Sequence, residues 1–135
     1  MQVVREEALD WLEEAAVDLQ RAERLLEMGD HSLSCYLSQQ AIEKALKAVM
    51  MGVKRRRPPH VHDLTALYSE VRDITPLPED IEDRLAEISQ YYVTARYPNA
   101  GLRRPSRSFT KGQAERALEA ARRVVEEARR ALAPP

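Results

Sequence analysis

Basic side chains gather in two parts of this sequence, and their chemistry suits a phosphate ligand. Residues 44–62 and 88–114 contain no aspartate or glutamate, yet they hold eleven of the twenty-one lysines and arginines. If the fold brings the two segments together, they form a positive surface that attracts a nucleotide or RNA. If it does not, they are loops with unneutralised arginines. The candidate phosphate ligands are Lys44, Lys47, Arg55, Arg56, Arg57, His62 and Arg96.

Arg96 is the member of this set whose position is most suggestive. It continues by one turn the helical line of Leu85, Ile88 and Tyr92, so its guanidinium is expected at the edge of the core. A planar guanidinium donates two parallel hydrogen bonds to a phosphate, which an ammonium cannot do. The ordinary alternative is a cation at a helix C-terminus, worth about 0.3–1 kcal/mol.

Polar residues also interrupt the apolar pattern of the segment from 33 to 53. Gln40, Glu43 and Lys47 share one helical stripe, and Gln39 lies on the neighbouring apolar stripe. Because a buried amide without partners costs about 1–3 kcal/mol, these side chains need hydrogen bonds. We expect Gln39, Gln40 and Glu43 to form a structural polar seam within the bundle or across a dimer, with Lys47 as a salt-bridge partner of Glu43.

Metal chemistry is not expected. His60 and His62 are two residues apart, and the only other histidine is His31. Neither cysteine ligands nor a His-Glu-x-x-His helix accompanies them, so a zinc site is not predicted. Glycine-rich phosphate loops are missing as well. No resident cofactor is expected, although a nucleotide such as ATP is a possible ligand.

Helical periodicity runs through nearly the whole chain, and no segment alternates with period two. The spacing, the capping residues and the prolines predict three long helices and a short one before an arginine-rich loop at about 98–109, with another long helix after it. We therefore predict an all-α fold, an antiparallel up-and-down helical bundle of four long helices plus one short helix. The helices are expected at about residues 4–28, from 30 or 32 to 53, from 63 to before Pro76, from 79 to before Pro98, and 110–132.

Length and composition bound the class of protein. A chain of 135 residues with 44% hydrophobic residues suits one domain, spanning 1–135, with a real core. Cys35 is the only cysteine, so no intrachain disulfide is possible. No apolar run approaches the ~20 residues that span a bilayer, and no basic-led apolar leader opens the sequence. We expect a cytoplasmic protein without a membrane partner.

Four sequence blocks stand in an order and spacing that cover most of the chain. They are W-x-x-x-A-x-x-DL from Trp11, QQAIEKALKA from Gln39, HDL from His62 and ARYP from Ala95. Together they resemble the HEPN family, the higher-eukaryote and prokaryote nucleotide-binding domain. The resemblance implies a helical bundle that usually forms a homodimer. It also implies pairing with a separately encoded minimal nucleotidyltransferase, often in a toxin-antitoxin-like module.

Many members of the wider family are metal-independent ribonucleases with an arginine followed after about four to six residues by a histidine. The histidine would transfer a proton and the arginine would stabilise phosphoryl charge. After Arg96 the motif is incomplete, because the expected positions hold Gly101, Leu102 and Arg103. The pairing of an arginine at 55–57 with His60 or His62 lies in an arginine run next to two prolines, and we do not count it as the motif.

These observations favour a dimeric HEPN-type module that binds a nucleotide or RNA phosphate and pairs with a minimal nucleotidyltransferase. One alternative is a metal-independent ribonuclease with an altered motif, in which Arg96 works with His62 of the same or a second protomer. Another is a purely structural adaptor. The position of the two acid-free segments in space distinguishes these hypotheses. Segments that converge favour the binding module, and segments that stay apart favour the adaptor.

Overall fold

The computed structural model describes the backbone of residues 2–134 and the side chains of residues 5–134. Within this part of the chain the only regular elements are helices, which confirms the predicted all-α fold. They are α1 (Gln2–Glu27), α2 (His31–Gly52), α3 (Leu64–Val71), α4 (Glu79–Thr94), α5 (Pro105–Ser108) and α6 (Lys111–Leu132).

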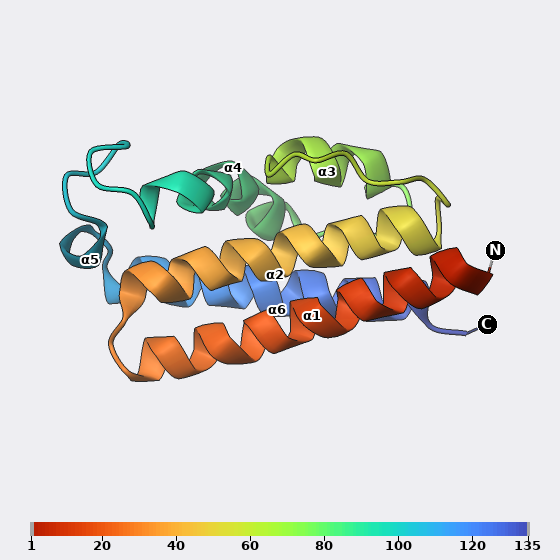
Figure 1. The fold of residues 1–135 in the computed structure, drawn as a ribbon, viewed down its shortest axis with the longest axis horizontal. Helices are drawn as coiled ribbons and strands as arrows, with labels where there is room; N and C mark the ends of the chain where they lie inside the picture. Colours follow the sequence, from red (N-terminus) through yellow and green to blue (C-terminus); the bar gives the residue numbers. More distant parts are fainter. Residues whose placement is uncertain (1, 135) are drawn as a thin grey trace.

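Helix α2 lies at the centre of the bundle. It runs antiparallel to α1, packs on α6 behind it, and carries α3 and α4 on the side away from α1 (Figure 1). Its side chains are therefore buried on more than one face, with Ile42 and Val49 fully buried and Leu46 1% exposed. Burial of each such side chain contributes about 1.5–3 kcal/mol, so α2 organises the core.

The predicted capping residues begin three of the helices. Asp30 accepts a hydrogen bond from the backbone N–H of Leu33 at the start of α2, and Asp63 caps α3. Thr110 and Gln113 form the expected capping box of α6. Each cap satisfies a backbone N–H that has no partner inside its helix, which explains why the boundaries were predictable.

Helix α5 is the element that the periodicity does not predict. It is a single turn of four residues inside the arginine-rich loop, with Pro105 in its first turn. Proline suits this position because its φ angle is already helical and its missing N–H is not needed there. One turn is too short to show a period of 3.6 residues, so the sequence pattern cannot reveal it.

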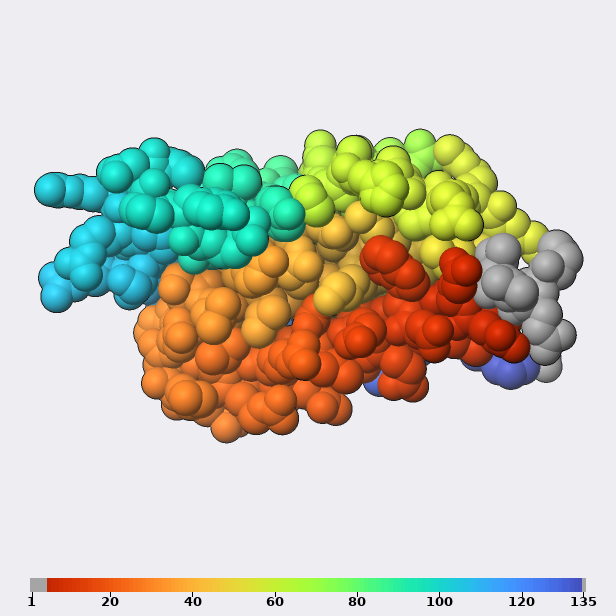
Figure 2. Space-filling model, in the orientation of Figure 1, coloured from red at the N-terminus to blue at the C-terminus, as the bar shows by residue number. Residues whose placement is uncertain are grey.

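The two acid-free segments leave the bundle at opposite ends. The chain after α2 begins at one end of the long axis and returns along the bundle towards α3, whereas residues 98–109 lie at the other end (Figure 1). Figure 2 shows this second loop projecting beyond the ends of α1 and α2. The two segments come into contact where the ring of His62 stacks on that of Tyr92.

None of the helices in the described part of the chain is long and apolar enough to cross a membrane.

Candidate functional site

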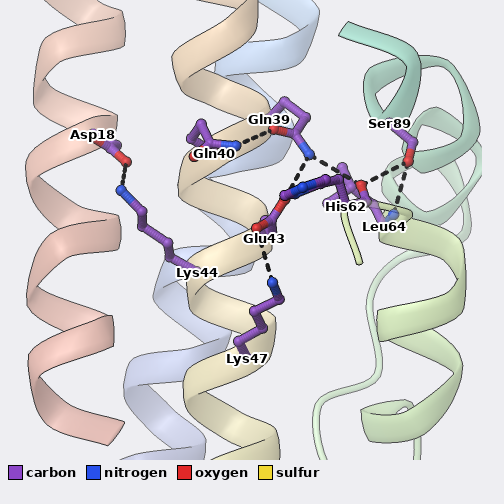
Figure 3. A network of polar contacts seen from close by, with 9 residues as sticks. All are labelled: Asp18, Gln39, Gln40, Glu43, Lys44, Lys47, His62, Leu64 and Ser89. Carbon is purple, nitrogen blue, oxygen red and sulfur yellow. Dashed lines mark hydrogen bonds and ion pairs between the residues drawn. The ribbon is translucent and has the colours of Figure 1, made fainter. Parts of the chain in front are cut away.

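A buried carboxylate on α2 is the centre of the polar seam. Glu43 is 5% exposed, and it accepts three hydrogen bonds (Figure 3). Its Oε1 atom lies 3.2 Å from Gln39 Nε2 and 2.9 Å from His62 Nδ1. Its Oε2 atom lies 3.0 Å from Lys47 Nζ. The carboxylate therefore has partners from its own helix and from the chain that precedes α3.

Gln39 completes the seam and is fully buried. Its amide nitrogen also donates to the backbone carbonyl of His62, at 3.2 Å, and its Oε1 atom accepts a hydrogen bond from Gln40 Nε2 at 2.8 Å. Ser89 of α4 donates to the same His62 carbonyl and accepts from the backbone N–H of Leu64. The seam thus joins α2, the start of α3 and α4.

The geometry of Glu43 sets the orientation of the His62 ring. Because a carboxylate can only accept, the proton of the imidazole lies on Nδ1, and Nε2 is left to meet a ligand. The ring stacks on Tyr92 with 3.6 Å between centroids and 12° between planes. The side chain is 43% exposed, so its free edge reaches solvent.

Arg96 lies just beyond the end of α4 and packs on the same tyrosine. Its guanidinium carbon is 4.4 Å from the ring centroid of Tyr92, 4.7 Å from that of Tyr36 and 4.8 Å from that of Tyr97. Its Nε atom donates to the carbonyl oxygen of Tyr92 at 2.7 Å. Within residues 5–134 no carboxylate forms an ion pair with Arg96, so its terminal nitrogens keep their capacity for an anion.

Tyr36 brings a phenol to this cluster. Its burial raises the pKa of the phenol above the ordinary value, and the nearby charge of Arg96 opposes this shift. A raised pKa keeps the hydroxyl protonated at neutral pH, so Tyr36 remains a hydrogen-bond donor. Its ring lies 6.2 Å from that of Tyr92.

Carboxylates of the protein itself pair with the two predicted lysine ligands. Lys44 Nζ lies 2.6 Å from Asp18 Oδ2, and Asp18 is only 2% exposed. Lys47 is buried, pairs with Glu43 and lies 5.7 Å from the ring centroid of Trp11. Figure 3 shows that Lys44 points towards Asp18 of α1 and that Lys47 points along α2 towards Glu43.

The arginine run lies elsewhere too. Arg55, Arg56 and Arg57 line a pocket of about 240 Å³ with Glu7 and Met51, near the C-terminal end of α2. Arg56 also pairs with Glu70 at 2.7 Å. Of the seven predicted basic ligands, the structure therefore brings only His62 and Arg96 onto one ring.

Three tyrosines of this cluster were missed as site residues. Tyr36 stands one turn before Gln40, Tyr92 stands one turn before Arg96, and Tyr97 belongs to the ARYP block. The spacing of Tyr92 and Tyr97 around Arg96 could have predicted that the arginine packs between aromatic rings. No local spacing, however, predicts that His62 stacks on Tyr92.

Other candidate chemistry is limited. Burial, followed by the charge of Glu87, raises the pKa of the Cys35 thiol to about 12, so it stays protonated and unreactive. In the part of the chain that the structure describes, no three His, Cys, Asp or Glu side chains converge as a metal site requires.

The sequence of the chain matches the HEPN domain family over residues 8–131. This chain belongs to the HEPN family. The match spans the seam, His62 and Arg96, and it confirms the resemblance seen in the four sequence blocks.

Known proteins similar to this HEPN chain agree with the fold. The crystal structure of TT1696 from Thermus thermophilus aligns with a TM-score of 0.80 and 31% identity, over 92% of this chain and 97% of that one. ST0689, an archaeal HEPN homologue, aligns with a TM-score of 0.74 and 25% identity, over 93% and 98%. A Methanocaldococcus jannaschii protein named "Putative toxin MJ1304" is 29% identical over 128 residues, covering 86% of this chain and 82% of that protein.

We predict that Glu43→Gln lowers the free energy of unfolding by about 3–5 kcal/mol, because the buried Lys47 ammonium loses its counter-charge. Adding Lys47→Met to Glu43→Gln should recover a large part of this loss, since both charges are then removed. Urea denaturation of the two single variants and the double variant measures the coupling.

Glu126→Gln is the control, because it breaks an exposed pair with Arg130 and should cost at most about 0.5 kcal/mol. Equal losses for Glu43→Gln and Glu126→Gln would show that the buried carboxylate does not organise the seam.

Proposed function

We propose that this HEPN chain binds the phosphate of a nucleotide or RNA, with His62 and Arg96 as its ligands, within a toxin-antitoxin-like pair. The observation that supports the proposal most strongly is that both basic side chains pack on the ring of Tyr92. Arg96 in addition has no carboxylate partner among the described residues. The toxin-named relative supports the biological setting.

The surroundings favour an anion at this position. A guanidinium held by aromatic rings presents its N–H groups in a fixed fork, which matches two phosphate oxygens. His62 adds a hydrogen bond through Nε2, and a full positive charge when it is protonated. Lys44 joins α2 to α1 through Asp18, and Lys47 neutralises Glu43 within α2. The arginines at 55–57 add long-range attraction for a polyanion.

Replacing Arg96 with glutamine should weaken the binding of a short single-stranded RNA and reduce the slope of log K against log salt by about 0.7, the contribution of one phosphate contact. Fluorescence anisotropy between about 50 and 200 mM salt measures both quantities. Arg129→Gln, which changes an exposed arginine of α6, is the matched control and should change the slope little. An absence of RNA binding at low salt, or equal slopes for the two variants, would refute the phosphate site.

The contact between Glu43 and His62 favours a second candidate function, metal-independent ribonuclease activity. A carboxylate that orients a histidine is the usual arrangement of a general base. His62 Nε2 would take the proton of a ribose 2′-hydroxyl, whose oxygen then bonds to phosphorus. The bond from phosphorus to the 5′ oxygen breaks, and that oxygen takes a proton from the imidazolium. Arg96 would stabilise the extra phosphoryl charge, and the products are a 2′,3′-cyclic phosphate and a 5′-hydroxyl.

If the chain cleaves RNA in the presence of EDTA, His62→Gln and Arg96→Gln should each slow cleavage about 100-fold, because they remove the base and the charge stabiliser. His60→Gln is the control, since His60 is exposed and only two residues away. Detection of a 2′,3′-cyclic phosphate identifies the chemistry. Equal cleavage by all variants would point to a contaminating nuclease and rule out this function.

A partner and a second copy are part of the proposal. The toxin-named relative supports a toxin-antitoxin-like pair. The homodimer and the minimal nucleotidyltransferase partner are proposed from the family resemblance. The chain alone should then slow the growth of a bacterial host, and co-expression of a nucleotidyltransferase encoded beside its gene should restore growth.

Light scattering should report twice the 15.4 kDa of one chain for the free protein, and a larger mass with the nucleotidyltransferase. A monomer that neither slows growth nor binds the nucleotidyltransferase would contradict the pair.

A further inference from the structure

A groove of about 820 Å³ has one of the two proposed phosphate ligands, His62, in its lining. His62 and Tyr92 line it together with residues of α3, α4 and the loop after α4. A phosphate alone does not need so much space. The groove therefore has room for the part of a nucleotide that is attached to the phosphate.

The side of the groove formed by α4 combines apolar surface with an unused polar group. Val93 is 43% exposed and, with Ala86, offers the apolar surface against which a planar ring can pack. Gln90 is exposed, and its carboxamide forms no hydrogen bond with any described residue. The hydroxyl of Thr94 donates to the backbone carbonyl of Gln90, not to its side chain. A carboxamide offers a donor and an acceptor side by side, which is what the edge of a nucleobase requires.

The side of the groove formed by the start of α3 carries a negative charge, which disfavours the phosphate of a ligand there. Asp63 lines the groove, and hydrogen bonds led by that from the Thr65 hydroxyl lower the pKa of its carboxyl group. The carboxylate is therefore charged at neutral pH and repels a phosphate. A neutral base fits beside Asp63, whereas the phosphate is placed at His62 and Tyr92, the residues that the groove shares with the proposed phosphate site.

The loop after α4 closes one end of the groove. Gly101 has a φ angle of 119°, and an added Cβ atom would lie 2.9 Å from Thr94 Cγ2. The backbone N–H of Asn99 donates to the carbonyl oxygen of Leu102 at 2.8 Å, which holds the loop in a tight turn. The groove thus ends at a close backbone contact.

We propose that this groove is a nucleobase subsite, in which the base packs on Val93 and Ala86 and Gln90 reads its edge. The inference rests on the proposed function, because the phosphate at His62 and Arg96 places the base. It assigns the ligand to the class of nucleotides and single-stranded RNA, in preference to inorganic phosphate or a non-nucleotide phosphate ester. Adenine is expected to bind best, since a glutamine side chain matches its N6 amino group and N7 atom.

Calorimetry with three probes tests the subsite: the dinucleotides ApA and UpU, and an abasic dinucleotide with the same sugar and phosphate. We expect ApA to bind about tenfold more tightly than the abasic probe, because the base adds packing and hydrogen bonds. Gln90→Leu should reduce the affinity for ApA about fivefold, the worth of about one hydrogen bond, and leave the abasic affinity unchanged. Ala86→Phe, which fills the groove, should bring ApA down to the abasic affinity.

The control for Gln90→Leu is Gln20→Leu, which makes the same change at an exposed position of α1. Equal affinities for ApA and the abasic probe, with Arg96→Gln weakening both, would refute the base subsite and leave the phosphate site standing. A loss of affinity for ApA that is equal in Gln90→Leu and Gln20→Leu would also refute it. If no probe binds, or Arg96→Gln changes nothing, the proposed function fails and the subsite fails with it.

Discussion

The burial of the Glu43 carboxylate is the constraint on which the rest of the site depends. A charge removed from water is tolerated only when donors surround it, and Glu43 obtains them from Gln39, Lys47 and His62. Two of these donors come from α2 itself. The third must come from the chain that leaves α2 at its far end, so that chain has to return along the bundle before α3 begins.

That return explains how two basic residues that are distant in the sequence come to pack on one tyrosine. The seam holds His62 against α2, and Ser89 holds the same segment against α4. Tyr92, one turn after Ser89, then lies beneath the imidazole. Arg96, one further turn along, lies over the same tyrosine. The lysines of α2 serve a different purpose, since buried carboxylates bind Lys44 and Lys47.

Local patterns predicted the parts of the fold that local physics determines. The helices follow from apolar spacing, and Asp30, Asp63 and Thr110 begin them because each supplies a side-chain acceptor to free backbone N–H groups. The pairing of Glu43 with Lys47 follows from a separation of one turn. The stacking of His62 on Tyr92 depends on the path of a loop, which no helical period encodes. The short turn at Pro105 escaped prediction for a related reason, since one turn carries no repeat.

The aromatic surroundings of Arg96 have a consequence for the selectivity of the proposed phosphate site. A free arginine side chain loses about 2 kcal/mol of rotamer entropy when a ligand orders it. Here three tyrosine rings and a backbone carbonyl already hold the guanidinium, so that entropy is lost during folding. The proposed phosphate would therefore meet a rigid receptor that needs little rearrangement. Such a receptor favours ligands whose oxygen atoms already have the matching separation, and it discriminates against anions of other shapes.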